Sequence, residues 1–245
     1  MAAPMHEYVD IHCHWLAGVD DGAPSVEDGL ALLGRLREVG FGTVYATPHM
    51  RAGLFDNERD ALRAAYEHMK ATVERTAGMP RIGLACEHHL DDTVFGRLLA
   101  GQGLPYPSGR AALVELPAER FPLRLGERMF ELRCQRIRPV LAHPERYRPV
   151  WRERAVLDPL LDGGVVLVLD LGALAGRYGR AARRCAEDLL EEGYYYAASS
   201  DAHRVEDVET VEAGMRRLFE LAGQEDATFM LTEGPQAILD GNVED

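Results

Sequence analysis

The chain of 245 residues carries 27 basic and 40 acidic side chains, which gives it a formal net charge of −13 at pH 7. That charge repels a polyanion and argues against an extended nucleic-acid surface, although a small anion could still bind at a local positive centre. With 47% apolar and 27% charged residues the composition is that of a globular protein, and no apolar run approaches the roughly 20 residues of a membrane-spanning helix.

The N-terminus and the cysteines restrict the protein class further. Residues 1–7 lack the basic segment and apolar core of a secretory signal, and we expect a short flexible tail there. Cys13, Cys86, Cys134 and Cys185 form no C-x-x-C pair, which indicates neither a thiolate zinc site nor a disulfide framework. None has an arginine six positions later, which excludes the phosphate loop of cysteine phosphatases. We expect reduced cysteines and a cytoplasmic location.

The first half of the chain alternates apolar runs with segments of helical period, which is typical of βα units. Ser25 and Asp28 form an N-cap signal before an apolar stripe, and Gly40 supplies a stop. The pattern predicts strands over residues 8–11, 41–47 and 81–86, with helices over 25–40 and 56–78.

The second half continues the alternation, and no linker or low-complexity tract interrupts it. Strands are predicted over 111–116, 138–143, 165–171 and 194–200, and helices over 125–134, 156–161, 181–192, 205–223 and 234–241. We therefore predict one α/β domain over residues 1–245, with seven parallel strands closed into a distorted, TIM-like (β/α)7 barrel. A doubly wound open sheet is the alternative.

Residues of metal-ligand type stand at the carboxyl ends of all but one of the predicted strands, the edge where such barrels carry their chemistry. Two pairs have i, i+2 spacing, which points both side chains of an extended segment to one side, so that they can bind one ion. A single histidine at a strand end is more often a hydrogen-bonded polar residue than a ligand, so the joint placement carries the prediction. The residues are His12, His14, His49, Glu87, Glu115, His143, Asp201 and His203.

The remaining histidines do not follow this pattern. We expect His6 in the tail, His68 on a helix surface, and His88 and His89 in a loop with at most a secondary role. The only lysine, Lys70, lies in the middle of a predicted helix, which argues against an amidohydrolase with a carboxylated lysine.

The motifs DIHCH, AHPERY and SDAH, with His49 and Glu87 after the second and third strands, resemble the PHP (polymerase and histidinol phosphatase) superfamily. The resemblance implies a metal-dependent phosphoesterase on a distorted seven-stranded barrel. More narrowly, VDDGAPSVEDGLALL, TPHMRAGLF, ALVELP and ALAGRYG resemble bacterial protein-tyrosine phosphatases that control capsule and exopolysaccharide synthesis. The likeness runs from about Val9 to the C-terminal helix. It implies that a metal-bound hydroxide attacks the phosphorus of phosphotyrosine on a bacterial tyrosine kinase.

This resemblance also implies a site for three divalent ions. Three such ions outweigh the charge of four carboxylates, so that an acidic chain can still hold a phosphate dianion. Manganese is favoured, with iron or zinc as alternatives, because the ligands are oxygen and imidazole. The ions would be held by His12, His14, Glu87 and Asp201; by the bridging Glu87 with Glu115 and His143; and by Asp21, His49 and His203.

Arginines would complete the phosphate site. By the resemblance Arg146 of HPERY contacts the phosphate; otherwise it is a surface residue paired with Glu145. The family typically has a further arginine shortly after the aspartate of D-x-H, where residues 206–208 of this chain are not basic. Arg204 and Arg51 are the candidate substitutes.

Two other functions remain open. One is a PHP phosphatase for a small metabolite such as histidinol phosphate, which a deep closed pocket would favour. The other is a metal-binding regulatory protein of weak activity that recognises a kinase tail. The expected partner is a phosphotyrosine-bearing protein, a polysaccharide-export tyrosine kinase, with neither nucleic-acid binding nor membrane insertion.

Overall fold

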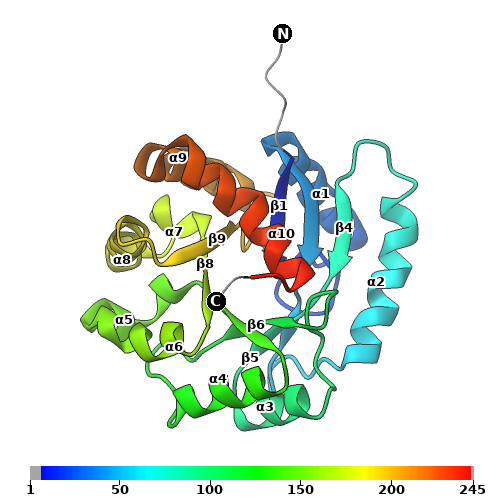
Figure 1. Ribbon diagram of the computed structural model, residues 1–245. Helices are drawn as coiled ribbons and strands as arrows, with labels where there is room; N and C mark the ends of the chain where they lie inside the picture. Colours follow the sequence, from blue (N-terminus) through cyan, green and yellow to red (C-terminus); the bar gives the residue numbers. More distant parts are fainter. Residues whose placement is uncertain (1–6, 244–245) are drawn as a thin grey trace.

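The computed structural model describes residues 7–243, and in it strands alternate with helices along the chain (Figure 1). Apart from Glu7, the predicted tail, with His6, lies outside the described residues. Glu7 itself makes ion pairs with Arg37 and Arg81, each at 3.1 Å. None of the helices within residues 7–243 combines the length and the apolar character needed to cross a bilayer.

The first half of the chain follows the sequence prediction closely. The N-cap of the first helix is present, because the Asp28 N–H donates to Ser25 Oγ at 3.2 Å, and Gly40 ends that helix with a left-handed φ of 115°. The elements are β1 (Tyr8–Cys13), α1 (Val26–Val39), β2 (Phe41–Ala46), β3 (His49–Met50), α2 (Arg59–Val73), β4 (Arg81–Leu84), β5 (Glu87–His89) and α3 (Asp92–Leu99).

The second half contains each predicted strand, together with several short helices that were not predicted. Its elements are β6 (Ala111–Glu115), α4 (Leu125–Cys134), β7 (Arg138–Ala142), the 3₁₀ turn η1 (Pro144–Arg146), α5 (Arg148–Arg152), the 3₁₀ turn η2 (Arg154–Leu157), α6 (Asp158–Asp162), β8 (Val166–Asp170), α7 (Leu171–Leu174), α8 (Gly179–Glu191), β9 (Tyr195–Ser199), α9 (Asp207–Leu231) and α10 (Glu233–Asp240).

Some boundaries differ from the prediction for local reasons. The helix predicted over 56–78 begins only at Arg59, because Asp56 Oδ1 accepts the Gly53 N–H at 2.8 Å and closes a turn before it. His68 is exposed on this helix, as predicted. The helix predicted to stop at Gly223 is interrupted there by a φ of 78°, but helical structure resumes and runs to Leu231.

All strand pairs among residues 7–243 are parallel, which confirms the predicted α/β class. The regular pairing is divided between two sheets, β1-β2-β4 and β3-β5-β6-β7-β8-β9. β3 and β5 follow β2 and β4 along the chain after short breaks, and the strand predicted over 81–86 therefore ends at Leu84. Between β1 and β9 there is no continuous ladder among residues 7–243; a single bridge joins Cys13 of β1 to Ala202, which follows β9.

The core has two layers, because side chains alternate along the strands. One layer packs between the strands and the helices around them. The other lies on the opposite side of the strands, where Ile238 and Leu239 of α10 join it, and Figure 1 shows α10 close to β1. The strand residues of this second layer are Val9, Ile11, Ala111, Leu113, Val140, Ala142, Val166, Val168 and Ala197. Apolar packing thus leaves the carboxyl ends of the strands to polar residues.

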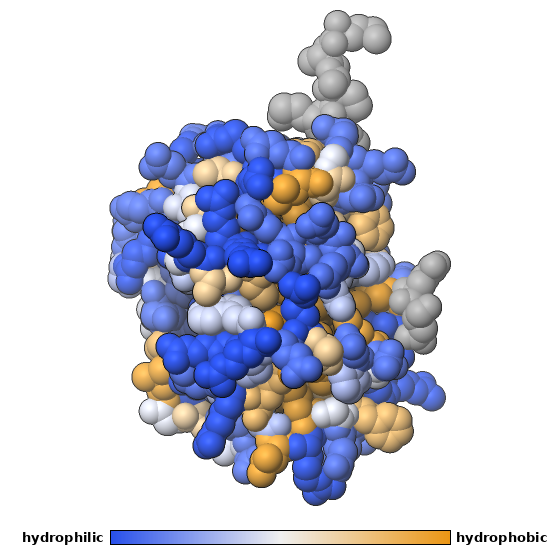
Figure 2. Space-filling view, turned by 90° about the vertical axis from the view of Figure 1, so that its left-hand side faces the viewer, coloured by the Kyte–Doolittle hydropathy of each residue, from blue (hydrophilic) through white to orange (hydrophobic). Residues whose placement is uncertain are grey.

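Hydrophilic residues cover most of the face shown in Figure 2, with apolar residues in smaller groups between them. Exposed ion pairs are common, such as Arg154 of η2 with Asp188 and Glu192 beside it, each at 2.8 Å. Exposed pairs of this kind contribute little to stability, so the fold depends chiefly on its apolar packing.

The close approach of α7 and α9 gives a test of that packing. A Cβ added at Gly214 would lie 1.9 Å from the Leu171 carbonyl oxygen. We expect Gly214→Ala to lower the free energy of unfolding by about 1–3 kcal/mol, despite the better helix propensity of alanine. Chemical denaturation measures the change. The control is Gly96→Ala in α3, where nothing lies within 4 Å of the added Cβ; equal stability of both variants would contradict the packing argument.

Candidate metal centre

The structure brings all nine predicted ligands together at the carboxyl ends of the strands. They form overlapping groups within which the potential ligand atoms all lie within 4.8 Å of one another. The groups are His12, His14 and Glu87; His12, His143 and Asp201; His49, Glu87 and Glu115; and His14, Asp21, His49 and His203. The arrangement shares residues between neighbouring groups, which suits several ions held side by side.

The two histidines of the H-x-H motif point to the same side, as their spacing predicted. Their Nε2 atoms lie 3.3 Å apart. His12 Nε2 is 3.3 Å from Glu87 Oε2 and 3.2 Å from Asp201 Oδ1, and His14 Nε2 is 3.5 and 3.4 Å from the same two oxygens. The Asp201 N–H donates to the His12 carbonyl at 2.9 Å, which fixes the D-x-H segment beside β1.

Glu87 lies at the middle of the cluster. Its Oε1 is 3.0 Å from His143 Nε2 and its Oε2 is 2.9 Å from His49 Nδ1. Glu87 Oε2, His49 Nδ1 and His143 Nδ1 are nevertheless buried without a hydrogen-bond partner. Buried polar atoms are normally satisfied, so these orphaned atoms of ligand type fit bound cations.

The ligand group that contains Asp21, His49 and His203 is more open to solvent than the groups around Glu87. The Asp21 side chain is 55% exposed, and its Oδ1 lies 3.4 Å from His49 Nε2 and 3.6 Å from His203 Nε2. The His203 ring stacks on His14 with centroids 4.0 Å apart. A group bound here would be reachable from outside the protein.

Backbone strain also marks the site. His143 and Asp201 have left-handed φ values of 37° and 44°, which residues other than glycine rarely adopt. Such strain persists only where the surrounding contacts enforce it, and it concentrates at functional sites.

The electrostatic environment of the ligand cluster stabilises positively charged groups. Burial alone would lower the pKa of His14, but Asp20, Asp201 and Glu87 outweigh it and raise this pKa well above its ordinary value. Burial would raise the pKa of Glu87, but His12 and His49 hold it well below its usual range. The buried carboxylates therefore stay ionised and require cations or protonated histidines around them.

Asp20 is a functional residue that sequence reasoning missed. The prediction used only its neighbour Asp21, yet Asp20 Oδ2 lies 2.8 Å from His14 Nδ1 and accepts the His49 N–H at 3.0 Å. It fixes which nitrogen of His14 faces the cluster. A Cβ on Gly22 would lie 2.1 Å from the His14 carbonyl oxygen, so the DDG turn needs its glycine for lack of space.

The prediction for His88 and His89 was wrong, because both are buried in β5 rather than in a loop. His88 bonds the Leu113 carbonyl at 2.8 Å and accepts the Leu104 N–H at 3.0 Å, and burial lowers its pKa to about 4. His89 Nδ1 lies 2.8 Å from Glu115 Oε2 and orients that carboxylate.

Arg146 reaches the edge of the cluster. Its Nη1 donates to Asp201 Oδ2 at 2.6 Å, its Cζ lies 4.5 Å from the centroid of the Tyr178 ring, and its side chain is 29% exposed. It is not paired with Glu145, which is buried and accepts from the Tyr195 hydroxyl at 2.9 Å.

The other two predicted arginines lie on different loops. Arg204 is exposed, and its Nη2 donates to the Asp21 carbonyl at 3.4 Å. Arg51 closes a turn by backbone bonds with Phe55, whose ring stacks on His49 at 5.3 Å.

No role was predicted for Arg177, whose guanidinium, like that of Arg146, lies close to the Tyr178 ring. It lies 5.6 Å from the centroid of the Tyr178 ring and 2.8 Å from Asp207 Oδ1. The other oxygen of Asp207 accepts the His203 N–H at 2.9 Å. Arg177 is the arginine of the ALAGRYG motif, but the sequence alone assigned it no role, because its partner Asp207 lies far along the chain at the start of α9.

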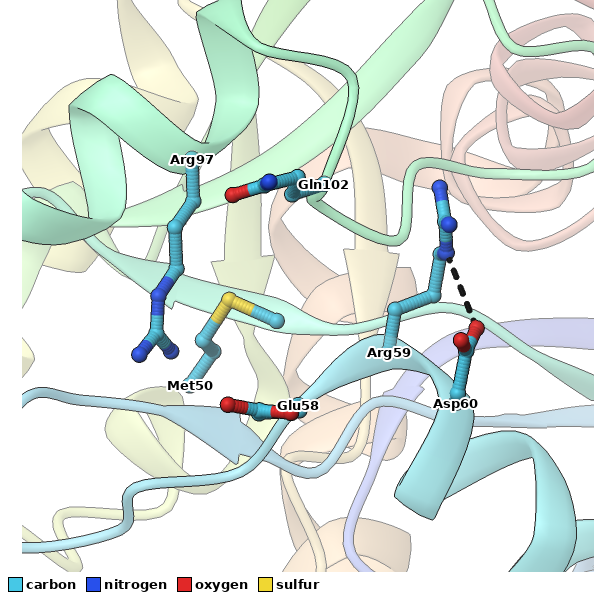
Figure 3. Close-up of a pocket in the computed structure, with 6 residues that line it drawn as sticks. All are labelled: Met50, Glu58, Arg59, Asp60, Arg97 and Gln102. Carbon is cyan, nitrogen blue, oxygen red and sulfur yellow. Dashed lines mark hydrogen bonds and ion pairs between the residues drawn. The ribbon is translucent and has the colours of Figure 1, made fainter.

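A cavity of about 220 Å³ adjoins the centre but contains none of the nine ligands (Figure 3). Met50, which follows His49 on β3, forms part of its wall. In Figure 3 Arg59 turns to Asp60, with which it forms an ion pair at 3.3 Å, while Arg97 extends toward Met50. Its charged lining is balanced in sign, and it offers no group of convergent metal ligands.

Comparisons with known proteins agree with this geometry. A sequence model of the family described as "Capsular polysaccharide synthesis, CpsB/CapC" matches residues 8–240. The chain is 28% identical over 233 residues to the tyrosine-protein phosphatase YwqE of Bacillus subtilis, covering 94% of this chain and 91% of that one. It is 24% identical to the putative tyrosine-protein phosphatase CapC of Staphylococcus aureus, covering 80% and 77%.

A solved structure also matches this chain over nearly its whole length. It comes from work on YwqE of Bacillus subtilis and CpsB of Streptococcus pneumoniae, described as unique metal-dependent tyrosine phosphatases. The TM-score is 0.88 at 28% identity, and the match covers 96% of this chain and 95% of that one.

Asp20 gives a test of how the centre binds metal. We expect Asp20→Asn to weaken divalent-metal binding by about 10–100-fold, because the carboxylate that orients His14 loses its charge. Calorimetric titration of the metal-free protein with manganese measures the affinity. Asp60→Asn, at a side chain that is 83% exposed, is the matched control; equal affinities for both variants and the wild type would show that Asp20 does not orient a ligand.

Glu145 gives the stability of the fold a pH dependence. Burial, with the charge of Asp170, raises the pKa of Glu145 to about 8. A pKa raised in the folded state means that its contribution to stability is fully present below the unfolded pKa of about 4.3 and is lost as pH rises through about 8. We expect Glu145→Gln, which stays neutral, to reduce the fall in melting temperature across that window by several degrees. Thermal unfolding at equal metal loading measures this, with the exposed Glu153→Gln as control; parallel curves for all three proteins would contradict the assignment.

Proposed function

The chain belongs to the CpsB/CapC family of capsular polysaccharide synthesis, and from this membership we propose that it is a metal-dependent protein-tyrosine phosphatase. The observation that carries the proposal is the meeting of nine metal-ligand residues beside the partly exposed guanidinium of Arg146. Relatives named as tyrosine phosphatases share nearly the whole length of the chain.

We assign the metal ligands as His12, His14, Asp21, His49, Glu87, Glu115, His143, Asp201 and His203, and we propose three divalent ions. Manganese is favoured over iron or zinc, because carboxylate and imidazole ligands without thiolates suit it. When bound, such ions supply Lewis-acid stabilisation of phosphoryl charge and activation of a water nucleophile. The exposed side at Asp21 leaves room for a substrate carried on a protein.

Arg146 would bind and orient the phosphoryl group. A guanidinium has several N–H donors, and only Nη1 of Arg146 is engaged by Asp201. The remaining donors can contact phosphoryl oxygens and stabilise charge that develops during transfer. Arg204 and Arg51 lie on loops near Asp21 and His49, and each remains a candidate for a second contact.

We extend the proposal to the fold, the substrate and the cellular location of the protein. We propose a single domain whose two sheets act as one distorted seven-stranded barrel. The substrate would be a phosphotyrosine-bearing protein, a tyrosine kinase of polysaccharide export, because the family takes its name from capsule synthesis. We propose the cytoplasm as the location, where four unpaired cysteines stay reduced.

Turnover by the manganese-loaded protein tests the function. We expect hydrolysis of a phosphotyrosine peptide in preference to a phosphoserine peptide and to histidinol phosphate. His12→Ala should lower kcat/KM on the phosphotyrosine peptide by at least about a hundredfold and reduce the bound metal, because it removes a central ligand. His68→Ala, at an exposed histidine on α2, is the matched control.

Other outcomes point to the other two functions. Preference for histidinol phosphate would make the protein a metabolite phosphatase. A fully metal-loaded protein without turnover on any of these substrates would replace the enzyme by a regulatory binding protein.

A further inference from the structure

Arg146 stands between two buried carboxylates. Its Nη1 lies 2.6 Å from Asp201 Oδ2 and 3.8 Å from Asp170 Oδ2. The side chains of Asp201 and Asp170 are only 3% and 1% exposed. Asp201 belongs to the ligand cluster, whereas Asp170 belongs to none of the ligand groups among residues 7–243.

The carboxylate of Asp170 is held firmly but has an unused oxygen. Its Oδ1 accepts the Gly172 N–H at 2.7 Å, and its own N–H donates to Glu145 Oε1 at 2.9 Å. Asp170 Oδ2, the oxygen nearest Arg146, is buried and has no hydrogen-bond partner of normal distance and angle among the described residues, although the Tyr178 side chain also approaches this carboxylate and helps to lower its pKa. A buried acceptor without a donor is costly, so its retention calls for a partner that reaches it in some state of the protein.

Arg146 is the cation placed to be that partner. Asp201 Oδ1 faces His12 and His14, and these residues would hold an ion that draws electron density from the whole carboxylate. Asp201 Oδ2 would then be a weaker acceptor for Arg146. Burial and the charge of Asp201 raise the pKa of Asp170 to about 7, and the Arg146 guanidinium opposes this shift. The ionised form of Asp170, which belongs to no ligand group in the described part of the chain, therefore attracts Arg146.

The other groups around Arg146 support it or are engaged elsewhere. The Tyr178 ring lies 4.5 Å from Arg146 Cζ and supports one side of the guanidinium. Glu145 is turned away toward Tyr195, and Arg177 is engaged by Asp207.

We propose that Asp170 is a positioning residue, which holds Arg146 against the Tyr178 ring so that its free N–H donors face the phosphoryl group of the substrate. This inference rests on the proposed phosphatase function and names a residue through which that site selects an anion. Asp170 itself touches neither metal nor substrate.

A double-mutant cycle between Asp170 and Arg146 tests the inference on the full-length, manganese-loaded protein. We expect Asp170→Asn to raise both KM for a phosphotyrosine peptide and the dissociation constant of inorganic phosphate by about tenfold, with a smaller change in kcat. In the Arg146→Ala background the same substitution should change neither quantity further. Metal content and melting temperature are measured for every variant, with Asp60→Asn on α2, whose side chain is 83% exposed, as the control.

A second variant controls for the loss of the N-terminal cap that Asp170 provides to α7. Asp170→Ser keeps a side-chain acceptor for the Gly172 N–H but removes the charge near Arg146, so it should reproduce the effect of Asp170→Asn. An equal loss of affinity with and without Arg146, or no loss in the wild-type background, would overturn the inference.

Phosphate binding separates this inference from the function itself. If the wild type binds phosphate but hydrolyses no phosphotyrosine, the proposed function fails while the cycle in phosphate affinity still decides the role of Asp170. If phosphotyrosine is hydrolysed but Asp170 and Arg146 act additively, only the positioning role fails.

Discussion

The structure depends on two buried carboxylates, Glu87 and Asp201, which stay ionised at the carboxyl ends of the strands. Burial opposes their charge, and only the surrounding histidines and Arg146 compensate it. Removing such charges from water costs several kcal/mol per ion unless opposite charge is close by. The need to gather positive charge at this edge accounts for the histidines on β1, on β3 and after β7, and for the fit of cations to the cluster.

A second set of buried carboxylates fixes the segments that carry Glu87, Asp201 and their neighbours. Asp20 orients His14, while Asp10 accepts from the Ser200 hydroxyl at 2.5 Å and ties β1 to the end of β9. Glu145 binds both Asp170 and Tyr195, so that the turn carrying Arg146 is fixed to β8 and β9. These carboxylates connect different segments around the site, and Asp10 in particular joins β1 to the end of β9, where the two strands lack a continuous ladder.

Much of this could be predicted from the sequence, because the H-x-H spacing at the end of β1 places its two side chains by local geometry alone. The N-cap at Ser25 and the stop at Gly40 are local in the same way. The same argument fails for D-x-H, since Asp201 has a left-handed φ of 44° and Asp201 and His203 belong to different ligand groups. Asp20 and Arg177 stand in the VDDG and ALAGRYG motifs, but their roles could not be predicted, since the contacts of Asp20 with His49 and of Arg177 with Asp207 form only in the fold. His88 and His89 look like loop residues because the strand that contains them is three residues long and follows a break.

The short pairing of β3 with β5 links the centre to the folding of the chain. In this ladder His49 is the register partner of Glu87, and Met50 of His88. So few backbone bonds specify their alignment weakly, and a slip by one residue would turn a ligand away from the cluster. Bound cations would penalise every misaligned arrangement, because only the observed alignment offers both ligands at once. On this edge of the sheet, bound metal would therefore favour the observed strand register over its alternatives.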